Sequence, residues 1–307
     1  MAITANTKQT YTASANAVDV NKFVVNVSPK DTPFYSMIGE TTAMARYKEN
    51  VADTLTAANA DNALIEGGNF SNTALTARSR GGNWCQIFSK VIEVSRTQEK
   101  VDKYGGVSSE IKYQITKAFK ELGTDVEKAY MVGASASGAT ATARTLDGLT
   151  SIASTNTATA ASGTTWTATA AASVVAFEEA LNDLFDLMYE TGQNADTVFV
   201  GGNRKRRISS LTTNITRNVE AMKKTQINSI DTYISDFGEV NIILERYVPD
   251  THVIAVALDY FKTAYLSKFM QEPLAKISDS MRFAVVGELT LDFYTEKAVG
   301  LLISDEV

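Results

Sequence analysis

Two residue types that often carry out chemistry occur once each in this sequence of 307 residues, as Cys85 and His252. A lone cysteine has no partner for an intramolecular disulfide, and the two residues match no recognised spacing of zinc ligands. Cys85 follows Trp84 in a run of β-formers, so we expect it to be a small buried apolar side chain. His252 opens the predicted strand 252–258, where we expect a packed or surface imidazole and not a catalytic base.

The motifs of nucleotide binding and nucleophilic catalysis are absent from the sequence. No run matches G-x-x-x-x-G-K-S/T or G-x-G-x-x-G, so nucleotide binding has no support. The nearest approach to a nucleophile elbow is the run GASASG at 133–138, which lacks the second glycine at the required place and follows a predicted helix. A hydrolase with its site in the segment 134–176 stays open as an alternative, although no His–Ser or carboxylate constellation supports it. We predict that the chain is not an enzyme and binds no cofactor or metal.

The composition is that of an ordinary globular protein with an acidic balance. Hydrophobic residues make up 44% and charged residues 21%, and 35 Asp plus Glu against 29 Lys plus Arg give a net charge of −6. This charge opposes nonspecific binding to phosphate backbones by the chain as a whole. The sequence has neither a signal-peptide pattern nor an apolar run of the ~20 residues that a bilayer span needs. We therefore expect folding in a cytoplasm and no membrane partner.

The first third of the sequence predicts a projecting structure with little core of its own. Residues 1–44 are typical of an extended arm, in which the apolar cluster at 32–39 must dock on something. Two runs of β-formers follow, 45–56 and 84–94, with a stretch rich in Gly, Asn and Ala at 59–72 between them. Two long strands joined by such a tip predict a protruding hairpin.

A long amphipathic helix over 107–132 is the strongest prediction, because apolar residues recur there at steps of three and four. At 1.5 Å per residue this helix is roughly 39 Å long. The segment 134–176 is almost free of charge, which leaves open a disordered stretch or a loop that leans on a neighbouring chain. The remaining predicted elements are a helix from Ser173 to Met188, a strand at 197–200, a short helix after Asn203, and strands at 240–244, 252–258, 263–266, 283–294 and 298–303. Together they indicate an α+β fold in two unequal parts.

The order of these elements, together with five short segments, resembles the tailed-bacteriophage major capsid (major head) proteins with the Hong Kong 97-type fold. Each segment alone is a weak signal, but the five follow one another in the order that this family has. They are Thr32-Pro33-Phe34, Gln86-Ile87-Phe88-Ser89-Lys90, Lys117-Ala118-Phe119-Lys120-Glu121-Leu122, Arg144-Thr145-Leu146-Asp147-Gly148-Leu149 and Gly287-Glu288-Leu289-Thr290-Leu291.

The resemblance implies a division of the chain into the parts of a Hong Kong 97-like α+β capsid fold. In this family the axial domain meets its copies at the centre of a pentamer or hexamer. The implied parts are an N-terminal arm at 1–44, an extended loop (a β-hairpin) at 45–92, a peripheral domain at 93–150 with a spine helix at about 107–132, an axial domain at 151–261, and C-terminal peripheral strands at 262–307.

The resemblance also implies a function, that of a major capsid protein which assembles itself into the pentamers and hexamers of an icosahedral phage head enclosing double-stranded DNA. The expected location is the virion, after assembly in the cytoplasm of a host bacterium. Expected partners are a portal, a separate scaffold and, where the head carries them, decoration proteins. Fewer than 110 residues precede the predicted long helix, so we expect no built-in scaffold domain and no N-terminal processing. An encapsulin-like nanocompartment shell and a tail-tube subunit stay open as alternatives.

Arg204, Lys205, Arg206 and Arg207 form the one dense basic run of the sequence, at the start of a predicted short helix. One interpretation is a solvated helix face that also pairs with acidic groups of the adjacent subunit. The other is a surface that lines the interior of the assembly and faces packaged DNA without reading its sequence.

Overall fold

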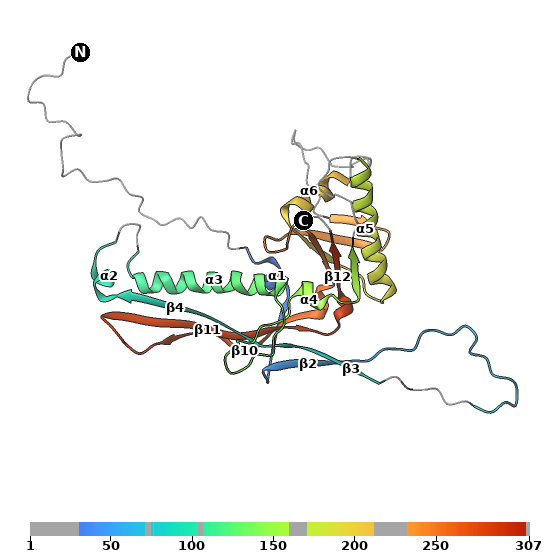
Figure 1. Cartoon of the computed structure of the whole chain (residues 1–307), viewed down its shortest axis with the longest axis horizontal. Coiled ribbons are helices and arrows are strands. Elements are labelled where there is room, and N and C mark those ends of the chain that lie inside the picture. Colours follow the sequence, from blue (N-terminus) through green and yellow to red (C-terminus); the bar gives the residue numbers. More distant parts are fainter. Residues whose placement is uncertain are drawn as a thin grey trace, which may run out of the picture.

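The computed structural model describes residues 31–70, 75, 77–103, 107–159, 171–211 and 232–304. Within these residues the strands form a four-stranded sheet, a six-stranded sheet and a two-stranded hairpin. Figure 1 shows a long helix lying along the four-stranded sheet, the six-stranded sheet with its helices above one end, and the hairpin projecting sideways from the same end. No helix of the described part is long and apolar enough to cross a membrane.

The four-stranded sheet and the long helix α3 (Glu110–Val132) form the first part of the molecule. The helix predicted from the periodicity is confirmed, and it begins where the Ser109 hydroxyl accepts a hydrogen bond from the backbone N–H of Lys112 at 3.3 Å. The carboxylate of Glu99 caps the same end, because it accepts from the N–H groups of Glu110 and Ile111. The strands, in spatial order, are β1 (Gly39–Thr42), β10 (Phe261–Pro273), β11 (Ser280–Phe293) and β4 (Gln86–Ser95), and the short helix α2 spans Arg96–Lys100.

The six-stranded sheet forms the second part and carries α5 (Ala171–Glu190) and α6 (Gly202–Leu211). Phe177, Leu181 and Leu184 of α5 pack on this sheet, so the helix buries its apolar stripe there. The strands, in spatial order, are β5 (Asn156–Thr159), β12 (Val299–Ile303), β9 (His252–Val256), β6 (Thr197–Val200), β8 (Gly238–Leu244) and β7 (Thr232–Ser235), and the 3₁₀ turns Leu258–Tyr260 and Glu296–Ala298 flank the crossings between the two parts.

The last strand, β12, differs from the expectation that it belongs with the peripheral strands. It pairs with β5 on one side and β9 on the other, and so lies inside the six-stranded sheet. Its side chains are apolar on both faces, and Val299 and Leu301 join one core while Leu302 joins the other. A Cβ on Gly300 would come within 2.7 Å of the Met188 sulfur, so this glycine lets α5 approach closely.

The hairpin also differs from its prediction. Its strands are β2 (Tyr47–Ala52) and β3 (Ser79–Trp84), with Tyr47 opposite Trp84, whereas the run from Gln86 onward is β4, which pairs with β11. The break falls at Cys85, a buried residue whose N–H bonds the Arg46 carbonyl at 2.8 Å. The predicted run at 84–94 is almost entirely β4. The second strand of the hairpin, β3, was missed because Gly81, Gly82 and Asn83 are poor β-formers.

The apolar cluster of the arm docks within its own subunit. The short helix α1 (Pro33–Met37) places the fully buried Phe34 edge-on to the rings of Tyr130, Phe199 and Phe261, at centroid distances of 6.0, 5.4 and 6.2 Å. Residues 1–30 of the predicted arm lie outside the described residues.

Much of the first half of the segment 134–176 also packs on its own subunit. Leu146 and Leu149 are fully buried, and α4 (Leu149–Ile152) begins at Gly148. A Cβ on Gly148 would lie 2.5 Å from the backbone nitrogen of Gly133, so the segment passes directly against the end of α3. Residues 160–170 lie outside the described part, and the question of a loop on a neighbouring chain stays open there.

Candidate assembly surfaces

The hairpin β2–β3 carries a group of exposed apolar side chains at its tip. Residues 53–70 between its strands form no regular secondary structure, and Figure 1 shows this tip reaching far from both sheets. Exposed apolar groups that gather in one segment mark an interaction surface. The tip side chains, with exposed fractions, are Leu55 (99%), Leu64 (57%), Ile65 (84%), Phe70 (92%) and Leu75 (95%).

Buried hydrogen bonds hold the base of this hairpin to the rest of the subunit. Asn83 is 1% exposed, and its amide nitrogen donates to the carbonyls of Asp147 and Leu291, both at 3.0 Å. Its side-chain oxygen accepts from the Asp147 N–H at 2.7 Å, so the amide is satisfied on both sides. On the paired strand, the Asn50 amide donates to the Asp292 carboxylate at 2.5 Å. The base is therefore fixed, and the tip projects from a rigid support.

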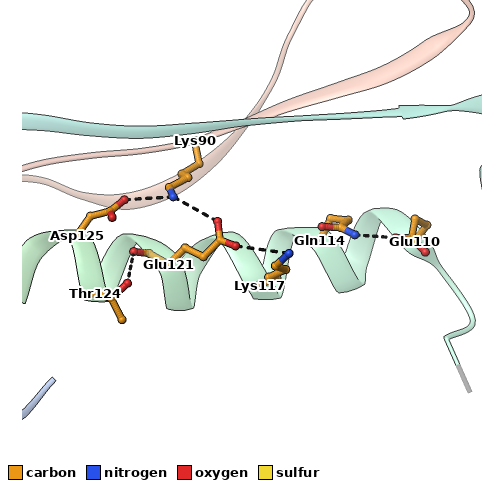
Figure 2. A network of polar contacts seen from close by, with 7 residues as sticks. All are labelled: Lys90, Glu110, Gln114, Lys117, Glu121, Thr124 and Asp125. Carbon is orange, nitrogen blue, oxygen red and sulfur yellow. Dashed lines mark hydrogen bonds and ion pairs between the residues drawn. The ribbon is translucent and has the colours of Figure 1, made fainter. Parts of the chain in front are cut away.

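A groove between α3 and β4 offers a second surface, of a polar kind. It has a volume of about 600 Å³ and is lined by Lys90–Ser95 of β4 and by one face of α3. Figure 2 shows its charged network, in which the Lys90 ammonium group lies 3.3 Å from Glu121 and 3.2 Å from Asp125. Along the helix, Lys117 pairs with Glu121 at 3.6 Å. These ion pairs connect helix α3 to strand β4 at the rim of the groove.

The electrostatics of this groove suit a contact surface. Partial burial acts to lower the pKa of Lys90, but hydrogen bonds with Asp125 and Glu121 outweigh it and raise that pKa. These side chains are partly exposed, so each pair contributes at most about 1 kcal/mol. Among the described residues no cluster of three or more His, Cys, Asp or Glu side chains could hold a metal ion. The lining of the groove is mainly polar and charged.

The structure divides the predicted basic run into residues with different environments. Arg204 is only 2% exposed, so the prediction that it lies on a solvated helix face is wrong. Its guanidinium group donates to the Asp250 carbonyl at 2.6 Å and to the Ser304 hydroxyl at 3.1 Å. Lys205 donates to the Ile242 carbonyl at 2.8 Å. The first two members of the run thus tie α6 to the six-stranded sheet. Arg206 is exposed and Arg207 half-buried, and for these two the interface or DNA-facing role stays a prediction.

The other candidate residues lie apart from one another. Cys85 is fully buried as predicted, and burial, followed by the charge of Glu288, raises the pKa of its thiol to about 11, which suppresses the nucleophilic thiolate. His252 is half-buried at the start of β9, bonds the Thr251 hydroxyl at 2.7 Å, and has its pKa lowered by burial. Ser135 is exposed in the irregular chain after α3 and not in a strand-to-helix turn.

Sequence reasoning missed the buried polar residues that join the parts, namely Asn83, Glu127, Glu245 and Asp292. Glu127 carried a signal, because it lies beside the apolar stripe of the long helix, one residue after Val126. For Asn83, Glu245 and Asp292, the neighbouring sequence gives no sign that the side chain is buried and not on the surface.

Comparisons with known proteins identify the family that has this arrangement of a projecting hairpin, a long helix and two sheets. Residues 3–305 match the SU10 major capsid protein family. The chain belongs to the SU10 major capsid protein family. This is a family of structural capsid proteins of phages. Over 123 residues the chain is 29% identical to the major capsid protein of Escherichia phage Phieco32, an overlap of 40% of this chain and 35% of that relative.

Solved structures show the same fold for this member of the SU10 family. A chain of Mycobacterium phage Adephagia aligns with a TM-score of 0.66 and 11% identity over 99% of each chain. The capsid of a native GTA particle aligns with a TM-score of 0.66 and 10% identity over 97% of this chain and 98% of that one. The capsid of Cyanophage P-SCSP1u gives a TM-score of 0.65 and 10% identity over 99% and 97%. The Hong Kong 97-type α+β capsid fold expected from the sequence is thereby confirmed.

Proposed function

We propose that this chain is the repeating subunit of a tailed-phage head and forms the pentamers and hexamers of an icosahedral shell around double-stranded DNA. The observation that carries the proposal is the hairpin β2–β3, whose base is held by the buried Asn83 while no described residue covers the apolar tip. Membership of the SU10 major capsid protein family supports the same conclusion.

In this proposal each part of the subunit has a role in the shell. The segment up to residue 44 is the arm, the hairpin β2–β3 is the extended loop, α3 with the four-stranded sheet is the peripheral domain, and the six-stranded sheet is the axial domain. A hairpin that lies on a neighbouring subunit makes a contact with different surfaces on its two sides, and such contacts close into rings when the rotation permits. Several modest contacts per subunit then add up to slow release from the shell.

The proposed partners follow from the same role. Further copies of the chain provide the main contacts, and a separate scaffold, a portal and decoration proteins would meet the finished or growing shell. The net charge of −6 suits a protein that encloses DNA without gripping its backbone. The role is structural and involves no catalysis, which agrees with a thiol held protonated inside the subunit.

Electron microscopy of particles formed by the full chain tests the proposal. We expect closed icosahedral shells, and we expect particles from infected cells to contain nuclease-resistant double-stranded DNA. Tubes, or subunits that stay monomeric in the presence of every other head protein, would contradict the proposal. A co-purifying enzyme in place of DNA would instead identify a nanocompartment.

The exposed Arg206 of the basic run allows a narrower prediction. Replacing Arg206 with glutamine would remove an ion pair to an adjacent subunit worth about 0.2–1 kcal/mol in every copy, so we expect a several-fold lower particle yield with unchanged DNA per particle. Gradient sedimentation and the ratio of nucleic acid to protein absorbance measure the two quantities. Normal yield with less DNA would favour the DNA-facing interpretation. Arg204→Gln serves as the contrast, because we expect it to destabilise the subunit itself.

A further inference from the structure

Two buried carboxyl groups meet where the arm, the long helix and the six-stranded sheet come together. Glu127 of α3 is fully buried, and Glu245, the residue after β8, is 1% exposed. The two oxygens of Glu127 accept hydrogen bonds from the backbone N–H groups of Phe34 and Tyr35, each at 2.8 Å. These N–H groups belong to the first turn of α1, where they have no partner within the helix. Glu127 therefore holds α1 on α3.

Glu245 reaches the same place from the other sheet. Its backbone N–H bonds the Val200 carbonyl of β6 at 2.9 Å, and its Oε1 accepts from the N–H of Tyr247 at 3.0 Å. Its Oε2 is buried and receives no hydrogen bond from a donor in the described residues. The carboxyl group of Glu127 lies near it, close enough that the charge of Glu245 raises the pKa of Glu127. Two carboxylates can only accept, so a hydrogen bond that satisfies this Oε2 from Glu127 requires a proton on one of the two groups.

The surroundings favour keeping that proton. Burial, the largest influence, raises the pKa of Glu127 to about 8; the N–H groups of Tyr35 and Phe34 act to lower it, and the charge of Glu245 acts to raise it. Neither carboxyl group forms an ion pair with a described Lys, Arg or His. The cation that follows in sequence, Arg246, pairs instead with Asp31 at 3.8 Å on the surface.

The other titratable groups around the pair are phenols. Burial raises the pKa of Tyr130, one turn along α3, well above its ordinary value, and raises that of Tyr265 in β10. The hydroxyl group of Tyr265 bonds that of Tyr35 in α1 at 2.5 Å. Tyr130 and Tyr265 stay neutral across the physiological range, so they neither supply a counter-charge to the carboxyl pair nor titrate with it.

We propose that Glu127 and Glu245 share one proton and form a latch, which holds α1 and the end of β8 against α3 and loosens when the proton is lost. Loss of the proton leaves two buried negative charges in contact, without a cation, at the point that joins the two sheets. The arm and the six-stranded sheet then gain freedom relative to the long helix. The latch is a property of the single subunit and does not depend on the proposed role in a shell.

The direction of the pH effect follows from linkage. A carboxyl group whose pKa is higher in the folded chain than in the unfolded chain binds more protons when folded. The stability that it contributes is complete below the pKa of an unfolded glutamate, about 4.3, and is lost as the pH rises toward 8 and beyond. We therefore expect the latch to weaken from neutral to mildly alkaline pH.

Glu245→Gln is the variant that tests the latch. Its side-chain oxygen can still accept from the Tyr247 N–H, and its amide nitrogen donates to Glu127, which can then stay ionised and keep both bonds to α1. Between pH 6.5 and 8.5 we expect the melting temperature of the native full chain to fall by about 4 °C, and that of the variant to change by much less. Neither His252 nor Cys85 interferes with this measurement. The pKa of His252 is lowered by burial and that of the Cys85 thiol is raised to about 11, so both groups change charge mainly outside the pH window.

Hydrogen exchange gives a second readout that needs no variant. Over the same window we expect the protection factors of the Phe34 and Tyr35 amides to fall at least tenfold in the native chain and to stay constant in Glu245→Gln. Glu239→Gln, an exposed change in β8, the strand that ends just before Glu245, is the matched control and should keep the native pH dependence. Constant protection at these two amides in the native chain, or an equal loss in the native chain and in Glu245→Gln, would overturn the proposal.

Discussion

Replacing Leu55, Phe70 and Leu75 with serine should abolish shell assembly and leave the subunit folded. The three side chains are almost fully exposed at the hairpin tip, so they contribute little to the stability of the isolated subunit. Buried against a neighbour, each would contribute about 1.5–3 kcal/mol, and three together at least about 4.5 kcal/mol. Since 1.4 kcal/mol corresponds to a factor of ten, we expect the concentration needed for assembly to rise about a thousandfold or more.

Light scattering against concentration measures this effect, with electron microscopy to identify the products. Circular dichroism and thermal melting should match the native chain, because the base of the hairpin is untouched. The matched control replaces Asn59, Asn62 and Asn69, which are polar residues of the same tip, with serine, and should assemble normally. Shells formed by the Leu55, Phe70 and Leu75 variant at the native concentration would show that the tip is not an assembly surface.

Phe34→Ala should cause the largest loss of subunit stability among single substitutions considered for the arm. The ring contacts Tyr130 of α3, Phe199 of β6 and Phe261 of β10, so it fills the space between the two sheets and the long helix. Truncating a fully buried phenylalanine costs about 3–5 kcal/mol, which combines lost burial and the cavity that remains. Urea unfolding of the full chain should show this as a lower free energy of unfolding.

Met37→Ala is the control for this change, because Met37 lies in the same short helix and is 45% exposed. We expect it to cost no more than about 0.5 kcal/mol, as is usual for surface positions. Phe34→Leu keeps most of the volume and should lose about 1 kcal/mol, so it remains measurable if the alanine variant does not fold. An alanine variant as stable as the native chain would show that α1 is not part of the core.

The elements of the fold were largely predictable from local patterns. Helix α3 follows from apolar residues at steps of three and four, and the alternation of Leu289 and Leu291 with polar neighbours marks β11. Strand β3 was not predictable, because Gly81, Gly82 and Asn83 are poor β-formers, and the predicted run at 84–94 corresponds to β4. A strand carries no local record of which distant strand it pairs with.

The candidate surfaces were predictable only in part. The first strand and the tip of the hairpin were predicted, but its second strand was placed in the run that forms β4. The basic run Arg204–Arg207 was treated as one cluster. The density of charge along the sequence does not show which side chain of the run is buried. Arg204 is buried because a carbonyl and a hydroxyl acceptor from distant segments lie within hydrogen-bonding distance of its guanidinium group. The contact of Glu127 with Glu245 likewise joins positions more than a hundred residues apart.

By itself the sequence determined the exclusion of familiar catalytic motifs, the long helix, the hairpin and the order of elements that resembles a phage capsid protein. These features depend on residue types and on spacing along the chain, which local sterics and burial translate directly into structure. Only the tertiary structure decided that β12 lies inside the second sheet, that Arg204 is internal and that two carboxyl groups share a buried site. Each of these depends on which faces of distant segments meet, and therefore on packing that no local pattern encodes.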